Sequence, residues 1–230
     1  MNKTLHVFLL AGQSNMAGRG DSAEVEPISD PEIRMFRDGR WQPAVEPLHH
    51  TKPERDAIGL GMSFAAEVRR LHPDWTVGLL PCAVGGTRLC RWEKGADLHK
   101  GAVAMMREAL VTGTLAGILW HQGEGDGHEA AEAESYGERL PRMITDLRAA
   151  LGAPSAPFVF GELGRFMAGH PNFPHIDPVL AAIQTIPARV PRCALVSSEG
   201  LEHRGDHLHF NAKALREFGL RYARAWAALS

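Results

Sequence analysis

The feature that most constrains the fold is an apolar run near the start of the chain, Leu5-His6-Val7-Phe8-Leu9-Leu10-Ala11, which stops at Gly12. A run of branched and aromatic residues ended by glycine indicates a strand buried on both faces. Such strands form parallel sheets covered by helices, and ligands bind outside their carboxyl ends. Ser14 follows this strand by two residues. The sequence therefore predicts an α/β fold with Ser14 at the binding edge of the sheet.

Apolar runs alternate with helical patterns along the rest of the chain. We expect helices at 62–71, about 100–111, 130–151, 179–186 and 212–229, and further strands at 76–81, 115–120, 157–163 and 193–197. This alternation predicts a three-layer α/β/α sandwich with a five-stranded parallel sheet. In the polar connection before residue 53, only Glu32–Arg37 is strand-like, and Trp41-Gln42-Pro43 is an extended or turn segment.

Composition limits the class of protein. A chain of 230 residues that is 44% hydrophobic can bury the core of one domain, which we expect to span 1–230. The net charge of -2 gives no support for a nucleic acid or a membrane as partner. Lys3 and the apolar run superficially resemble a secretory signal, but cleavage there would remove Ser14. We expect a cytoplasmic protein, with a signal peptide already removed as the alternative.

The chain has three cysteines, Cys82, Cys90 and Cys193. Their odd number and irregular spacing argue against a disulfide framework and a thiolate zinc site. Buried, reduced thiols are the favoured interpretation, and a Cys82–Cys90 pair is the alternative.

A candidate base and acid lie in one short segment near the end of the chain, Gly205-Asp206-His207-Leu208-His209-Phe210-Asn211. A serine hydroxyl is a weak nucleophile until a base removes its proton, and the base needs an orienting carboxylate. Asp206 and His209 could supply both, and His207 competes for the base. The other interpretation is a polar loop in which Asp206 or Asn211 caps the last helix.

Candidate oxyanion donors follow two more predicted strands. A backbone N–H in Gly85-Gly86-Thr87 could approach a substrate closely, and Gln122 could present its side-chain amide. A Gly-Gly pair alone is usually only a turn. Together, however, Ser14, Gly86 and Gln122 each follow a predicted strand, so all three candidate groups lie at one edge of the sheet. Residues 12–16, Gly-Gln-Ser-Asn-Met, lack the second glycine of G-x-S-x-G, which argues against an ordinary α/β-hydrolase.

Four segments follow one another along the chain: Gly12-Gln13-Ser14-Asn15-Met16-Ala17-Gly18, Val84-Gly85-Gly86-Thr87, His121-Gln122-Gly123-Glu124 and Asp206-x-x-His209-Phe210. In this order they resemble the motif blocks of the SGNH hydrolases. More closely, they look like the branch of carbohydrate esterase family 6, which includes acetylxylan esterases, and sialate O-acetylesterase-like domains. The resemblance covers nearly the whole chain.

This resemblance implies a flavodoxin-like sandwich that deacetylates O-acetylated sugars, such as acetylxylan or acetylated sialic acid, without a cofactor or metal. By position, it makes Ser14 the nucleophile, His209 the base and Asp206 its orienter. The N–H groups of Ser14 and Gly86 and the Gln122 side chain would form the oxyanion hole. Residues expected to support the site or bind substrate are Gln13, Glu124 and Trp92. The sequence departs from the family pattern at two positions, where Gly125 replaces a common serine and Asn211 a common aspartate.

Three alternatives stay open. Glu124 and Asp126, beside His121 and His128, could form a metal site or a glycosidase acid/base pair. Aromatic and basic side chains could line a sugar site or pack in the core or rim; these are Trp92, Arg91 and Trp41. The protein could also be a short-chain esterase or thioesterase acting on non-sugar esters, or a carbohydrate-binding domain whose active site has decayed.

Overall fold

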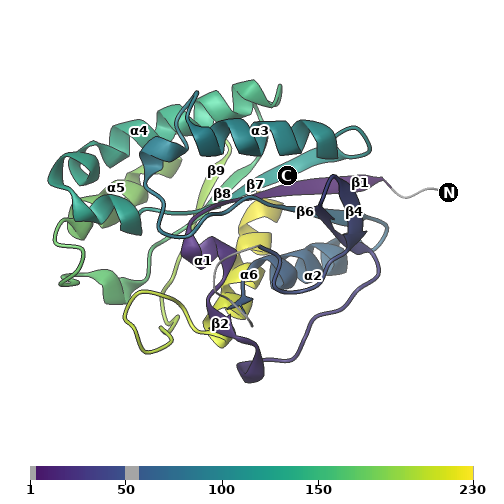
Figure 1. The fold of residues 1–230 in the computed structure, drawn as a ribbon, viewed down its shortest axis with the longest axis horizontal. Helices are drawn as coiled ribbons and strands as arrows, with labels where there is room; N and C mark the ends of the chain where they lie inside the picture. The colour runs from purple at the N-terminus through teal and green to yellow at the C-terminus, as the bar shows by residue number, and fades with distance from the viewer. Residues whose placement is uncertain (1–3, 50–56, 230) are drawn as a thin grey trace.

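The computed structural model describes residues 4–49 and 57–229, which form a three-layer α/β/α sandwich (Figure 1). Its seven-stranded sheet has the order β4-β3-β6-β1-β7-β8-β9. In chain order these strands are β1 (Leu5–Gly12), β3 (Ile33–Arg37), β4 (Arg40–Pro43), β6 (Thr76–Pro81), β7 (Thr114–His121), β8 (Phe158–Gly161) and β9 (Cys193–Val196). All neighbours pair in parallel except β3 and β4. The expected fold class is therefore confirmed.

The predicted sheet was too small by two strands. β3 extends the parallel sheet along β6, with Met35 opposite Leu79, and β4 returns antiparallel as an edge. The two strands are joined by Asp38 and Gly39, whose φ angles are 54° and 72°. Asp-Gly with both φ angles positive is the strongest short-range hairpin signal, because its twist matches that of the strands. Trp41 is thus in a strand rather than a turn.

Helices cover both faces of the sheet, with α3, α4 and α5 on one side and α2 and α6 on the other (Figure 1). In chain order the helices are α1 (Ser14–Ala17), α2 (Gly61–Leu71), α3 (Asp97–Ala109), α4 (Ala130–Ala150), α5 (Ile176–Arg189) and α6 (Ala212–Ala227). The five predicted helices are present with shifted ends. α5, for example, begins at Ile176 instead of 179 and ends at Arg189 instead of 186.

Shorter elements complete the chain. β2 (Gly20–Asp21) and β5 (Ala57–Ile58) form a small antiparallel sheet, and single 3₁₀ turns are η1 (Ser22–Glu24), η2 (Leu89–Arg91), η3 (Glu124–His128) and η4 (Arg165–Met167). No helix within the described ranges is long and apolar enough to cross a bilayer. The cysteines are free; Cys193 is buried and Cys82 half-buried, whereas Cys90 is exposed, contrary to the expectation of buried thiols.

The central strand supplies both hydrophobic cores. Side chains alternate across a strand, so Val7 and Leu9 pack beneath α3 and α4, and Phe8 and Leu10 pack beneath α2 and α6. These residues are fully buried. The apolar run of β1 therefore fixes this strand in the middle of the sheet, as its two-sided burial predicts.

The same strand brings the candidate groups together at its carboxyl end. β1 is in register with β6 through Leu10–Pro81 and with β7 through Gly12–His121. Gly12 has a φ of 124°, and a Cβ there would lie 2.1 Å from the His121 carbonyl oxygen. Only glycine lets the chain turn this close to β7. The segments after β1, β6 and β7 consequently share one edge of the sheet.

Candidate active site

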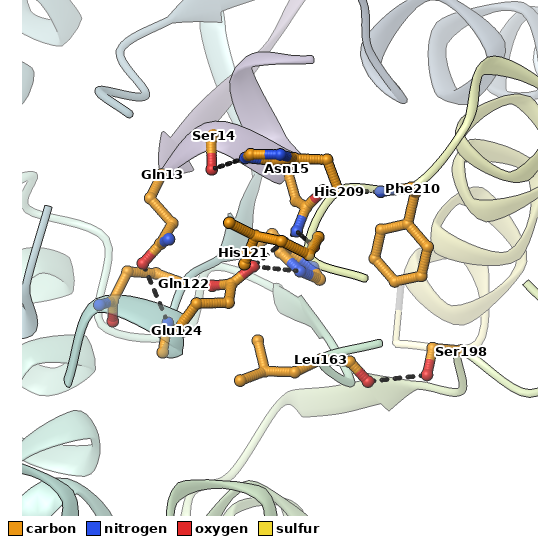
Figure 2. A network of polar contacts seen from close by, with 12 residues as sticks. Gln13, Ser14, Asn15, His121, Gln122, Glu124, Leu163, Ser198, His209 and Phe210 are labelled. Atoms are coloured by element: carbon orange, nitrogen blue, oxygen red, sulfur yellow. Dashed lines mark hydrogen bonds and ion pairs between the residues drawn. The ribbon is translucent and has the colours of Figure 1, made fainter. Parts of the chain in front are cut away.

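Ser14, His209 and Asp206 form a continuous chain of hydrogen bonds. Ser14 begins α1 directly after β1, and its Oγ lies 3.0 Å from His209 Nε2, a contact visible in Figure 2. His209 Nδ1 lies 2.7 Å from Asp206 Oδ2. The imidazole is thus placed between a hydroxyl and a carboxylate, in the geometry that general-base activation of a serine requires.

The Asp206 carboxylate is held by its own loop. Its Oδ1 accepts the backbone N–H groups of Leu208 at 3.0 Å and His209 at 2.8 Å. Partial burial acts to raise the pKa of Asp206, but these N–H groups and the His209 ring outweigh it, and the pKa lies below its usual value. Asp206 is therefore a carboxylate at neutral pH, able to orient the ring of His209.

The structure separates the two candidate histidines. His207 has a φ of 54°, in the left-handed region, and its ring lies 4.0 Å from the ring of His203. His209, two residues on, meets Ser14. The left-handed residue turns the loop so that the side chains at 207 and 209 have different partners, and only His209 contacts Ser14.

Asn15 is a site residue that the sequence reasoning missed. It is 1% exposed, and its Nδ2 donates to Glu124 Oε1 at 2.6 Å and to the Leu208 carbonyl at 3.1 Å. Its Oδ1 accepts the N–H of Phe210 at 3.1 Å. Asn15 thus binds the backbone on both sides of His209 (Figure 2). The position of Asn15, directly after the proposed nucleophile, was the available signal.

Glu124 is fully buried beneath Asn15. Its Oε1 also lies 3.6 Å from His121 Nε2. Burial acts to raise the pKa of Glu124, but the contacts with His121 and Asn15 outweigh this effect and lower it. Glu124 therefore supports the loop that carries His209. Among residues 4–49 and 57–229, no cluster of three His, Cys, Asp or Glu side chains could hold a metal ion.

Two backbone N–H groups beside Ser14 have no protein acceptor. Within the described ranges, neither the N–H of Ser14 nor that of Gly86 donates a hydrogen bond. Gly86 has a φ of 70° and open space where its Cβ would lie, and a Cβ on Gly85 would be 3.7 Å from Ser14 Cβ. The Gly85–Gly86 loop therefore packs beside Ser14, and these two N–H groups could donate to an oxyanion formed there.

The Gln122 side chain is engaged elsewhere. Its Nε2 donates to the Thr87 carbonyl at 3.0 Å and to Asp126 Oδ2 at 2.6 Å, and the residue is 1% exposed. The Tyr136 hydroxyl lies 3.2 Å from Oε1 and 2.8 Å from the backbone carbonyl of Gln122. An amide has only two N–H donors. In this arrangement Gln122 braces the loops after β6 and β7 and has no N–H left for an oxyanion.

Gln13 contacts the loop after β7 from the other side. It is 3% exposed, and its Oε1 accepts the N–H of Gly125 at 3.2 Å and that of Gly123 at 3.5 Å. A Cβ on Gly125 would lie 3.0 Å from the Thr87 carbonyl oxygen. Glycine at position 125, where the family commonly has serine, therefore permits close packing of the loops after β6 and β7.

The aromatic residues considered for a sugar site pack within the protein. Trp92 is 1% exposed, meets the ring of Trp120 edge-on at 5.2 Å and donates from Nε1 to Thr87 Oγ1 at 3.2 Å. Trp41 packs edge-on against Phe36. Arg91, on the surface, pairs with Asp97. Trp92 and Trp41 thus pack against neighbouring aromatic rings, and Trp92 supports the Gly86–Thr87 loop.

A parallel α/β sheet with hydrogen-bonded Ser, His and Asp side chains at the carboxyl ends of its strands is typical of serine hydrolases. Asp206 and His209 lie three residues apart on one loop, unlike the acid and base of ordinary α/β-hydrolases. Comparison with known families makes the assignment specific. The chain belongs to the family described as carbohydrate esterase, sialic acid-specific acetylesterase, whose profile matches residues 4–228.

Individual relatives agree with this assignment. The chain is 35% identical over 240 residues to a probable carbohydrate esterase of Arabidopsis thaliana, covering 96% of this chain and 89% of the relative. The X-ray structure of that Arabidopsis protein superposes with a TM-score of 0.88 at 31% identity and covers 99% of both chains. A carbohydrate acetylesterase from Xanthomonas citri shares the fold, with a TM-score of 0.73 at 23% identity over 97% of this chain and 56% of that one. The protein is therefore an ester hydrolase of the carbohydrate esterase class.

Proposed function

We propose that this esterase removes acetyl groups from O-acetylated sugars, with Ser14 as nucleophile, His209 as general base and Asp206 as the group that orients His209. The observation that carries the proposal is the pair of contacts from Ser14 Oγ to His209 Nε2 at 3.0 Å and from His209 Nδ1 to Asp206 Oδ2 at 2.7 Å. The family and its named relatives support a carbohydrate ester as the substrate class.

In the first half of the reaction, Ser14 Oγ attacks the acetyl carbonyl carbon while its proton passes to His209 Nε2. The carbonyl π electrons move to the oxygen, which becomes an oxyanion. When the intermediate collapses, the bond from carbon to the sugar oxygen breaks. His209 gives its proton to that oxygen, so the deacetylated sugar leaves and Ser14 carries the acetyl group.

In the second half, water replaces the sugar. His209 takes a proton from the water as its oxygen attacks the acetyl carbon, and a second oxyanion forms. Collapse of this intermediate returns the proton to Ser14 Oγ and releases acetate. The N–H groups of Ser14 and Gly86 are proposed to stabilise both oxyanions, and loss of one such donor typically costs about 2.7–4 kcal/mol of transition-state stabilisation.

The test compares wild type with Ser14→Ala on 4-nitrophenyl acetate, an O-acetylated sialic acid and a peracetylated xylo-oligosaccharide. Ser14→Ala should lower kcat by a factor on the order of 10⁵ to 10⁶. The control is Ser198→Ala, because Ser198 is also buried but donates to the Leu163 carbonyl, outside the hydrogen-bond chain of Ser14. Wild-type activity that survives Ser14→Ala would refute the proposed nucleophile.

Two further outcomes separate the rival functions. Equal rates on acetate and on long-chain 4-nitrophenyl esters, with no acetate released from either sugar, would indicate a general esterase. Binding of acetylated sugars without turnover of any ester would indicate a decayed, carbohydrate-binding domain.

A further inference from the structure

Two buried glutamines flank the proposed site, and their amide groups are in opposite states. Gln122 has both N–H donors occupied, whereas Gln13 has both unoccupied. We propose that the side-chain NH₂ of Gln13, and not that of Gln122, is the third donor to the oxyanion. This inference rests on the proposed function, because it assigns a donor for the intermediate formed on Ser14.

The orientation of the Gln122 amide follows from its neighbours. Its Nε2 faces the backbone carbonyl of Thr87 and the carboxylate of Asp126. The carbonyl can only accept hydrogen bonds, and the same holds for the carboxylate when it is ionised. Rotating the amide by 180° would direct its oxygen at these acceptors. The NH₂ group of Gln122 therefore stays on Thr87 and Asp126.

The neighbours of Gln13 determine the opposite orientation. Its Oε1 faces the N–H groups of Gly125 and Gly123, which can only donate. A rotated amide would direct its NH₂ at these two donors. The oxygen therefore lies on the loop after β7, and the NH₂ lies on the other side, where no residue within 4–49 or 57–229 accepts a hydrogen bond from it.

Gln13 as a residue is only 3% exposed, but its Nε2 is not one of the buried side-chain atoms that lack a partner, so this NH₂ reaches solvent at the site. Gln13 directly precedes Ser14. In the view of Figure 2, the Gln13 side chain descends beside Ser14, with its amide nitrogen on the Ser14 side of its oxygen. The unpaired N–H groups of Ser14 and Gly86 belong to the same edge of the sheet. A substrate carbonyl oxygen on Ser14 supplies the acceptor that all three donors lack.

The loop after β7 then contributes to catalysis through Gln13. Gly123 and Gly125 hold Oε1, and Gln122 and Asp126 hold the loop itself against Thr87. As the acetyl carbon becomes tetrahedral, its oxygen gains negative charge and the Gln13 N–H donates to it. No bond to Gln13 forms or breaks in this step. The donor is fixed before the reaction, so no reorganisation is needed when the charge develops.

The test is a pair of substitutions at residue 13, assayed on 4-nitrophenyl acetate in a preparation whose activity has been shown to need Ser14. Gln13→Glu keeps an oxygen for the Gly125 and Gly123 N–H groups but removes the NH₂. Gln13→Met is similar in size, neutral, and lacks both donor and acceptor. Both should lower kcat about 10²- to 10³-fold with little change in KM. Gln13→Met should also lower the Tm, because it leaves the loop N–H groups unpaired.

Gln122→Met is the comparison at the second amide. It should lower the Tm, since Asp126 and Thr87 lose a donor, and should lower kcat by less than tenfold at a temperature where the variant is folded. Affinity for a boronic acid that forms a tetrahedral adduct with Ser14 should fall in Gln13→Glu in parallel with kcat/KM. A purely structural role for Gln13 predicts no such parallel.

A kcat of Gln13→Glu within fivefold of wild type overturns the inference, as does a larger kcat loss in folded Gln122→Met than in Gln13→Glu. Either result leaves the proposed function intact if Ser14→Ala is inactive. Ser14-independent or absent wild-type activity instead refutes the proposed function itself.

Discussion

Replacing Asn15 by alanine should destabilise the protein and slow its reaction together. The side chain makes two neutral hydrogen bonds, to the Leu208 carbonyl and from the Phe210 N–H, worth about 1 kcal/mol each. Its bond to the Glu124 carboxylate adds about 1.5–3 kcal/mol, because one partner is charged. Asn15→Ala should therefore cost about 4 kcal/mol. In a chain of 230 residues this corresponds to a Tm lower by about 8–16 °C.

The kinetic effect follows from what Asn15 holds. Leu208 and Phe210 flank His209, whose Nε2 must stay near 3 Å from Ser14 Oγ. A displacement of about 1 Å costs about 100-fold in rate, so kcat should fall by about this factor. Urea unfolding and thermal melts measure the stability, and 4-nitrophenyl acetate hydrolysis well below the variant's Tm measures kcat.

The control is Asn211→Ala, two residues beyond His209. The Asn211 side chain accepts one hydrogen bond, from the Ala214 N–H at 2.8 Å, as the N-cap of α6. Its loss should cost about 1 kcal/mol and leave kcat within a few-fold of wild type. The reasoning is refuted if Asn15→Ala is no less stable than Asn211→Ala, or if its kcat stays within threefold of wild type.

Two further predictions concern carboxylates. Asp206→Asn should lower kcat about 10⁴-fold, because an amide no longer selects the tautomer of His209 that can accept the Ser14 proton; steady-state kinetics on 4-nitrophenyl acetate test this, and a loss of less than tenfold would contradict the assigned role. Burial raises the pKa of Asp126 from 3.8 to about 6, although Gln122, the Leu89 N–H and Arg139 oppose this. The folded protein then binds this proton more tightly than the unfolded chain, so the free energy of unfolding should fall as pH rises from about 4 to about 6, by about 3 kcal/mol. Urea titrations across this range should show a flatter pH dependence for Asp126→Asn, and identical slopes for the two proteins would rule out this source of pH dependence.

The sequence was sufficient to predict the position of polar groups that directly follow strongly apolar strands. The runs that became β1, β6 and β7 are two-sided buried strands, and the parallel order that they imply places Ser14, Gly86 and Gln122 on one edge. Asp206 and His209 could be proposed because their side chains lie on one short loop. The hairpin of β3 and β4 was also predictable in principle, since Asp38-Gly39 is its turn signal.

The orientation of individual polar side chains could not be predicted in the same way. Whether Gln13 or Gln122 has a free NH₂ depends on which backbone donors and acceptors the loops after β6 and β7 present, and this is a property of the packed loops. The choice of His209 over His207 likewise depends on a left-handed residue within the loop. Trp92 was a candidate for sugar contact because the sequence does not show that its ring packs against Trp120, a residue distant along the chain.

The separation of Ser14 from His209 by 195 positions has a consequence for the order in which the enzyme becomes active. During synthesis the segment with Ser14, the proposed nucleophile, leaves the ribosome first, and His209, the proposed base, follows 195 residues later. α6, which begins three residues after His209, supplies Trp226 to pack against Phe8 of β1. A nascent chain that has not yet reached α6 therefore exposes one face of its central strand and carries an unactivated serine. With His209 as the proposed base, a ribosome stalled before residue 209 should carry a chain without esterase activity.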